Sequence, residues 1–388
     1  MADALSDLRA AFPVAELWVY FNHAAVAPVS LPVERAVAEF LREARDHGSA
    51  GFKGWLERRE TARAHAAALL GARASEVAFT TSTSQGLLTV AEGLHLQPGN
   101  ELVVLEDDFP ANRIPWWRQE RRGARVVPVP RRGGRVTVDD VMARVSPRTR
   151  VVAVSWVAWD NGFRLDLAGL GAAIAARNAA AAREGRGACE TLLCVDAIQG
   201  LGALPLDVEA CRIDFLSADS HKWLLGLEGL GLFFCRASRL AELDGPLVSW
   251  WSLARPFEPW TPDAPLQPDA RRFEYACLPT AEIFGVEAAL RLLRDTGSQA
   301  VSRQVLALTA RLARGLQEAG WELLSPVASD AERSGILSAR HPDRPARAVV
   351  ERLLAARVQV VERGGGVRFA PHAWNSADEV DRVLEALA

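Results

Sequence analysis

The sequence predicts an α/β protein whose large domain contains a mostly parallel sheet, followed by a smaller α+β domain. The first observation is the alternation of short apolar runs with longer helical patterns up to residue 236, which is typical of strands and helices wound around a parallel sheet. The second is the almost unbroken apolar run at residues 151–158, as expected for a strand buried on both faces. The third is the mixture of helices and short strands after residue 270, which indicates the smaller unit.

The individual elements follow from the same patterns in chain order. After a short N-terminal helix, helical patterns cover residues 33–46, 55–70, 81–94, 167–184, 280–294 and 298–319. Strand patterns cover residues 77–81, 101–105, 124–129, 151–158, 192–196, 214–219, 229–236, 335–340 and 366–371. Residues 244–270 are rich in proline and tryptophan, so we expect an irregular crossing segment there.

Composition excludes several classes of function. The 388 residues hold 45 Lys+Arg and 48 Asp+Glu, a net charge of −3, which argues against a nucleic-acid partner. No apolar run reaches the roughly 18 residues that span a bilayer, and the acidic N-terminus lacks a signal-peptide core, so we expect a cytoplasmic protein without a membrane partner. The five cysteines include no C-x-x-C pair, which argues against a disulfide framework and against a metal site.

Lysine is scarce, and this draws attention to Lys222. The chain has only two lysines, Lys53 and Lys222, and all its other basic residues are arginine. A lysine can lose its proton and act as a nucleophile, whereas an arginine cannot. Lys222 follows a predicted strand and has apolar neighbours that would lower its pKa by desolvation. It is therefore a candidate for a Schiff base with an aldehyde cofactor, the alternative being a structural lysine with a salt-bridge partner.

Two further features strengthen this interpretation. Asp196 ends a predicted strand, with Gln199 three residues later and the His221–Lys222 pair further along. An acid that keeps a pyridine nitrogen protonated and a lysine that holds an aldehyde are what pyridoxal phosphate chemistry requires. Residues 79–87 place hydroxyl side chains at a strand-to-helix junction, where free amides can bind a phosphate. A strand-end cap for Asp196 and ordinary helix capping by the hydroxyls are the alternatives.

These residues resemble a known family, the fold-type I pyridoxal-phosphate enzymes of the class V aminotransferase group, which includes cysteine desulfurases, kynureninases and isopenicillin-N-epimerase-like proteins. The resemblance extends from residue 20 to residue 387, and its most specific blocks are VDAIQGLGALPLDV and DFLSADSHKWLLGLEGLG, at 195–208 and 214–231. It implies a seven-stranded sheet in a large domain at 21–260, a small domain at 261–388, and an N-terminal segment at 1–20 that packs with the small domain. It also implies a homodimer.

The resemblance implies seven residues that hold pyridoxal 5'-phosphate. Lys222 forms the internal aldimine, Asp196 pairs with the pyridine nitrogen, and Gln199 lies beside the phenolic oxygen. The phosphate is bound by Thr83, Ser84 and His221. Phe109 stacks on the cofactor ring. An offset ring stack contributes on the order of 1 kcal/mol beyond area burial.

The resemblance also implies a substrate side that binds an amino acid. Arg368 would bind the α-carboxylate through a bidentate pair, and Asn22 and His23 would line the substrate side. The alternatives are a core position for Phe109, a surface position for Arg368 and a structural role for His23.

The chain departs from the family pattern at several positions. Residues 357–369 contain no cysteine, which predicts that the protein is not a persulfide-forming cysteine desulfurase. Cys277 stands where relatives have a threonine that reaches a partner's phosphate. We expect a buried small hydrophobe there, the alternative being a thiol in a site shared between subunits. Asp219 replaces a serine near the phosphate and would repel the phosphate unless its side chain points away or bonds His221. Trp156 and Trp159 predict a bulkier, more aromatic substrate side.

The predicted function is amino-acid chemistry through a Lys222 aldimine, with class V transamination first because it needs no additional acid or leaving-group pocket. A C–S or C–N lyase, or an epimerase, is the alternative within the family. A non-catalytic pyridoxal-phosphate-binding or regulatory protein is an alternative of another class. A dinucleotide-binding protein is disfavoured because no G-x-G-x-x-G motif follows an early strand.

Overall fold

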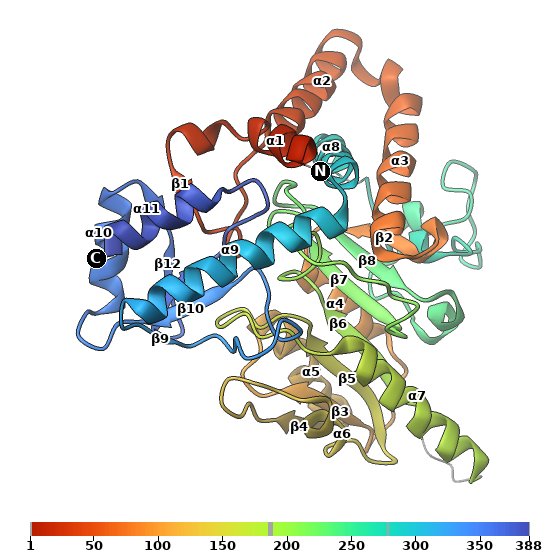
Figure 1. The fold of residues 1–388 in the computed structure, drawn as a ribbon. Coiled ribbons are helices and arrows are strands. Elements are labelled where there is room, and N and C mark those ends of the chain that lie inside the picture. Colours follow the sequence, from red (N-terminus) through yellow and green to blue (C-terminus); the bar gives the residue numbers. More distant parts are fainter. Residues whose placement is uncertain (1, 185–188, 278, 388) are drawn as a thin grey trace.

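A seven-stranded sheet forms the centre of the computed structural model, which describes residues 2–184, 189–277 and 279–387 (Figure 1). Its strands, in spatial order, are β2 (Val77–Thr80), β8 (Gly231–Cys235), β7 (Phe215–Asp219), β6 (Leu192–Asp196), β5 (Thr149–Ser155), β3 (Glu101–Leu105) and β4 (Arg125–Val129). Strands β7, β6, β5, β3 and β4 run parallel, and β8 is antiparallel to both of its neighbours. The predicted fold class, an α/β protein with a mostly parallel seven-stranded sheet, is confirmed.

Both faces of this sheet are buried, which explains the continuous apolar runs in its central strands. In β5, Val152 and Val154 belong to one core cluster, whereas Val151 and Ala153 belong to the cluster on the opposite face. The predicted strand at 151–158 was three residues too long at its C-terminal end, because the apolar residues after Ser155 leave the sheet.

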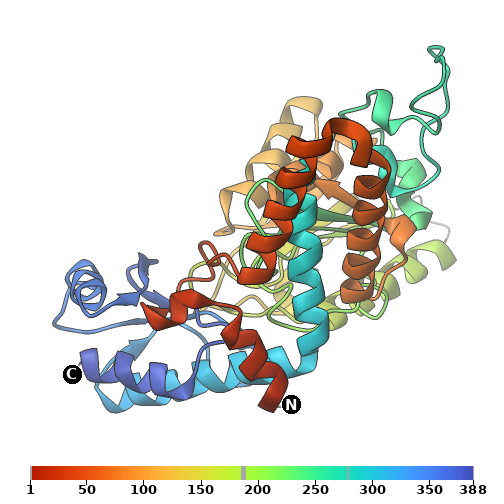
Figure 2. The same cartoon turned by 90° about the horizontal axis from the view of Figure 1, so that it is seen from above.

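The α-helices of the described residues pack on this sheet and on a smaller one near the C-terminus and connect the strands. They are α1 (Ala2–Ala10), α2 (Leu31–His47), α3 (Phe52–Leu70), α4 (Thr83–Gly93), α5 (Ile114–Arg118), α6 (Val138–Met142), α7 (Leu167–Arg183), α8 (Thr280–Thr296), α9 (Ser298–Glu318), α10 (Ala346–Ala355) and α11 (Ala377–Leu387). Helix α8 packs against both α2 and α3, as Figure 2 shows. Among the described residues, no helix is long and apolar enough to cross a membrane.

A second, antiparallel sheet lies near the C-terminus and packs with α9, α10 and α11 around its own apolar cluster. Its strand order is β12 (Val361–Arg363), β13 (Gly366–Phe369), β10 (Leu337–Arg340) and β9 (Glu322–Leu323). The N-terminal strand β1 (Val19–Tyr20) pairs in parallel with β11 (Val358–Gln359), so the two ends of the chain meet beside this sheet. The domain boundaries at residues 20 and 260 stay predictions.

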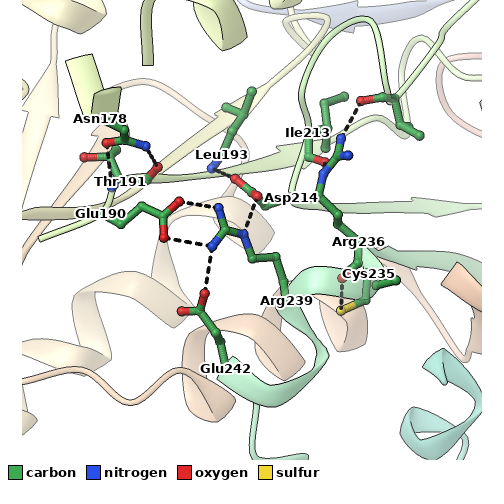
Figure 3. Close-up of polar contacts among 12 residues, drawn as sticks. Asn178, Glu190, Thr191, Leu193, Ile213, Asp214, Cys235, Arg236, Arg239 and Glu242 are labelled. Atoms are coloured by element: carbon green, nitrogen blue, oxygen red, sulfur yellow. Dashed lines mark hydrogen bonds and ion pairs between the residues drawn. The ribbon is translucent and has the colours of Figure 1, made fainter. Parts of the chain in front are cut away.

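A network of charged side chains joins the amino ends of β6 and β7 (Figure 3). Arg239 donates to Glu190, to Glu242 at 2.8 Å and to Asp214 at 2.8 Å. The other oxygen of Asp214 accepts from Leu193 N at the start of β6, at 2.8 Å. Burial raises the pKa of Asp214, and its hydrogen bonds and the nearby arginines oppose that shift. The network fixes the edge of the sheet that lies opposite the carboxyl ends of these strands.

A buried ion pair connects α3 to the segment that follows the central sheet. Arg63 and Glu274 are almost fully buried, with Arg63 Nη1 at 2.6 Å from Glu274 Oε1. Arg63 also donates to Val77 O at 2.8 Å, and Glu274 Oε1 accepts from Phe79 N at 2.9 Å. The pair therefore anchors edge strand β2, whose C-terminal end leads into the residues predicted to bind phosphate.

Replacing Glu274 by alanine is expected to lower the free energy of unfolding by about 3 kcal/mol, because the Arg63 charge loses its buried partner and keeps only the half-exposed Glu60, 3.0 Å away. The midpoint of urea denaturation measures this. Arg347→Ala is the matched control: its partner Glu351 is 3.2 Å away and both side chains are exposed, so a loss below about 0.5 kcal/mol is expected. Equal shifts in the two variants would contradict the role of the buried pair.

Candidate active site

A cavity of ≈ 620 Å³ opens at the carboxyl edge of the central sheet. Its walls come from the segments that end or follow β2, β3, β5, β6 and β7, and the carboxyl edge is where open α/β sheets bind ligands. All seven residues predicted to hold the cofactor line this cavity: Thr83, Ser84, Phe109, Asp196, Gln199, His221 and Lys222. The structure therefore brings together in one cavity side chains that lie far apart in the sequence, from Thr83 to Lys222.

Lys222 lies in the turn after β7, with its side chain largely buried. Its pKa is lowered to about 8, mainly by burial, with the charge of Arg368 adding to this and the carboxylate of Asp196 opposing it. The Nζ atom lies 6.0 Å from the centroid of the Phe109 ring. A substantial fraction of this amine is therefore neutral near pH 8, as a nucleophile or a general base requires.

Asp196 ends β6 at the bottom of the cavity and is buried. Its pKa is raised to about 7, mainly by burial and then by the nearby carboxylate of Asp108. Ile198 N donates to Asp196 Oδ1 at 3.0 Å and opposes this shift. A buried carboxylate of this kind is stabilised in its ionised form by a cationic partner such as a protonated ring nitrogen.

The N-terminus of α4 forms the anion-binding wall of the cavity. Ser82 caps the helix by accepting from Gln85 N at 3.2 Å, and Thr83 and Ser84 occupy its first turn. Thr83 Oγ1 accepts from Asp219 N at 2.8 Å, whereas the Ser84 side chain is exposed. Backbone amides in the first turn have no helical partner and are suited to binding a phosphate.

Asp219 contacts His221 beside this wall. Asp219 Oδ1 accepts from Ser220 N at 2.9 Å and lies 3.0 Å from His221 Nδ1, although that contact lacks hydrogen-bond geometry. The two side chains are therefore in contact, but the hydrogen bond considered for Asp219 and His221 is not formed.

Gln199 is held in a single orientation by residues from two other segments. Trp223 Nε1 donates to Gln199 Oε1 at 3.0 Å, and Gln199 Nε2 donates to Ala24 O at 3.0 Å. One amide hydrogen on Nε2 is left over, and the residue lines the cavity. This arrangement suits a donor to a cofactor oxygen.

An aromatic wall faces Lys222. Phe109 is 44% exposed although it lines the cavity, and its ring meets Trp159 edge-on at 5.8 Å. Trp156, by contrast, is buried and packs under Gly200, where a Cβ would lie 2.4 Å from the indole. Trp159 therefore lies in the cavity wall, where the prediction of an aromatic substrate side requires it. The prediction is wrong for Trp156, whose indole is buried in the core.

Asp108 is a site residue that the sequence analysis missed. It is buried and accepts from Ser155 Oγ at 2.6 Å, from Asn112 Nδ2 at 3.0 Å and from Phe109 N at 2.8 Å. These bonds tie the loop that carries Phe109 to the end of β5. The signal in the sequence was an acid directly before the aromatic residue, but its partner Ser155 lies far away along the chain.

The three predicted substrate-side residues lie next to the cavity but not in its lining. Arg368 is buried on β13, and its Nη1 donates at 2.7 Å to the carbonyl oxygen of Trp159, a wall residue. Burial lowers the pKa of Arg368 to about 10, and its Nε is a buried donor without a partner. Asn22 Oδ1 is likewise buried and unpartnered. Each residue thus has one buried polar atom that no described group satisfies.

His23 is engaged within the protein. Its Nδ1 lies 3.0 Å from Ala370 O, and its Nε2 accepts from Trp374 Nε1 at 3.0 Å. Burial, followed by the neighbouring His372, lowers its pKa well below the usual range, so the ring is neutral. This bonding supports the structural alternative; the substrate-side role stays a prediction.

Cys277 does not lie in the cavity, and the expectation of a buried thiol is wrong. It is exposed beside α3, in a separate hollow that includes Phe52, Arg59 and Trp251. The irregular segment that carries it leaves it uncovered within a single chain.

Comparisons with known proteins agree with this site. The Aminotransferase class-V family model matches residues 19–373. The uncharacterized aminotransferase YcbU of Bacillus subtilis is 26% identical over 380 residues, 98% of this chain and 96% of that protein. A probable cysteine desulfurase of Methanothermobacter thermautotrophicus is 27% identical over 312 residues, 79% and 74% of the two chains. The apo structure of a cysteine desulfurase from Thermococcus onnurineus NA1 has a TM-score of 0.87 at 24% identity, covering 98% and 96%.

These relatives contradict one prediction, that the protein is not a persulfide-forming cysteine desulfurase. Proteins named cysteine desulfurases align along most of the chain. The prediction relied on one short segment, residues 357–369, which lacks a cysteine. A single short segment is weak evidence against similarity that extends along most of the chain.

The residues of the cavity fit pyridoxal phosphate, the cofactor of this family. They supply an amine with a lowered pKa, a buried carboxylate, a helix N-terminus and an uncovered aromatic face. These groups match the aldehyde, the ring nitrogen, the phosphate and the ring of the cofactor. With this donor set and a family model that matches residues 19–373, the chain belongs to the class-V aminotransferase family of pyridoxal-phosphate enzymes.

Proposed function

We propose that the protein converts an α-amino acid and that Lys222 moves the proton on the substrate's Cα atom. The observation that supports this is the position of Lys222, an amine with a pKa of about 8 that lies 6.0 Å from the Phe109 ring centroid, in a cavity that Asp196 also lines. When bound, the cofactor supplies an aldehyde that condenses with amines and a ring that accepts electrons from Cα.

The other residues have supporting roles in this proposal. Asp196 holds a proton on the ring nitrogen by providing the opposite charge. Phe109 covers one face of the ring, and Thr83 and Ser84 with the amides of α4 bind the phosphate. Arg368 binds the α-carboxylate, which satisfies its buried Nε.

Transamination is the proposed reaction, because it requires only these groups. The second candidate is cleavage of a C–S bond, which the relatives named cysteine desulfurases favour. The homodimer and the cytoplasmic location expected from the sequence remain part of the proposal.

A panel of L-amino acids tests this proposal. The holoenzyme is incubated with each amino acid, with and without a 2-oxo acid acceptor. We expect formation of a new amino acid that depends on the acceptor. Release of sulfide from cysteine or cystine without an acceptor would instead favour the second candidate. A protein that binds the cofactor yet converts no amino acid would contradict both reactions.

A further inference from the structure

The hairpin of β12 and β13 carries two arginines on one face. Val361 pairs with Arg368 and Arg363 pairs with Gly366 in this antiparallel hairpin. Paired residues in antiparallel strands point to the same face, and so do residues two apart in one strand. Arg363 and Arg368 are therefore diagonal neighbours on the same face, close enough for long side chains to act on one ligand.

This face adjoins the cavity. Arg368 Nη1 donates to the carbonyl oxygen of Trp159 at 2.7 Å, and Trp159 lines the cavity. The hairpin turn lies against Asp160, the residue after Trp159, since a Cβ atom on Gly364 would be 3.4 Å from Asp160 Cβ. Burial is the main cause of the lowered pKa of Lys222 and of Arg368, and the charge of Arg363 lowers both further.

The positive charge on this face is not balanced by the surrounding acids. Asp160, the nearest acid, is held by Arg131, whose Nη1 lies 2.9 Å from both carboxylate oxygens. Within the described part of the chain, Arg363 is exposed, makes no ion pair, and donates only to Glu362 O at 3.4 Å. Arg368 has a buried Nε without a partner. Two arginines on one face, with no described acid free to pair with either, leave positive charge that an anionic ligand can balance.

We propose that Arg363 binds a second anionic group on the substrate, so that the protein prefers amino acids with an acidic side chain. This proposal for Arg363 rests on the proposed function in one respect, which is that Arg368 binds the α-carboxylate of the substrate. Arg363, on the exposed end of the hairpin, takes the distal group, which is a carboxylate or a phosphate.

Binding of unreactive acids to the holoenzyme tests this without turnover. Glutarate and pentanoate have the same chain length, and only glutarate has a second carboxylate. Calorimetry gives the ratio of their affinities in the wild type, in Arg363→Gln and in Arg382→Gln. Arg382 is the control because it is also exposed and lies on α11, which packs on α9 and α10 away from the hairpin face. We expect the ratio to fall about fivefold in Arg363→Gln, the worth of a partly exposed charge pair, and not in the control. Arg363→Lys should restore part of it.

The remaining outcomes separate the alternatives. A larger loss with 3-phosphonopropionate than with glutarate would support the proposal and identify a phosphate as the distal group. An unchanged ratio in Arg363→Gln would overturn it. This includes the case in which both affinities fall equally, since Arg363 would then act on the same carboxylate as Arg368. If neither acid binds the wild type, the role of Arg368 in the proposed function fails together with this proposal.

Discussion

Replacing Lys222 by alanine is expected to abolish turnover of every amino-acid substrate, with kcat lowered by at least about 10³-fold. The variant removes the only amine in the cavity lining and with it the group that would take the Cα proton. Lys222→Arg should be equally inactive, because it keeps the positive charge but cannot lose its proton. Initial rates with the best substrate from the amino-acid panel measure both losses.

Borohydride reduction of the wild type provides an independent readout. It should fix one cofactor on the peptide that contains Lys222, and mass mapping is simple because the chain has only two lysines. Lys53→Ala is the matched control, since Lys53 is exposed and its nearest acid, Glu57, lies 3.9 Å away. It should keep full activity and full labelling. A label on Lys53, or wild-type activity in Lys222→Ala, would overturn the assignment of Lys222.

The central strands and the polar residues at their carboxyl ends could be predicted from the sequence because burial on both faces makes the strands continuous apolar runs. The chain order of those strands then places Asp196 and Lys222 at one edge, whatever the details of packing. The same argument does not locate a strand's end. The apolar run at 151–158 continues past β5 because Trp156 is buried in the core and Val157 lines the cavity, and in the sequence these two residues look like more of the strand.

Residues whose role depends on distant partners could not be predicted. Asp108 acquires its role from Ser155, and both ring nitrogens of His23 are engaged by Ala370 and Trp374, some 350 positions away. Trp156 belongs to the core only because Gly200 leaves room for its indole. Such pairings follow from tertiary packing, which a single sequence does not reveal.

Replacing Asp196 by asparagine is expected to lower kcat by about 10²–10³-fold and to weaken cofactor binding. The amide is similar in shape but carries no charge, so it cannot stabilise a proton on the ring nitrogen. Loss of one well-placed electrostatic partner typically has an effect of this size. Kinetics at saturating pyridoxal phosphate separate the effect on kcat from the loss of affinity.

Asp196→Asn is also expected to change how the stability of the apoprotein depends on pH. Burial and Asp108 raise the pKa of Asp196 to about 7, above the value near 3.9 in an unfolded chain. Between these values the folded apoprotein binds more protons than the unfolded chain, so its stability falls as the pH rises from about 4 to about 7. Asp196→Asn removes this contribution, and the apoprotein should then lose less of its melting temperature across that range than the wild type.

Asp214→Asn separates these effects from the general consequences of removing a buried carboxylate. Asp214 is also buried with a raised pKa, but it lies at the amino edge of the sheet, bonded to Arg239 and Leu193. Its replacement should lower stability while leaving kcat and cofactor affinity near wild type. If Asp214→Asn slows turnover as much as Asp196→Asn, the loss reflects a disturbed sheet. If Asp196→Asn leaves turnover intact, Asp196 does not act on the ring nitrogen, because a residue in that role cannot lose its charge without slowing the reaction.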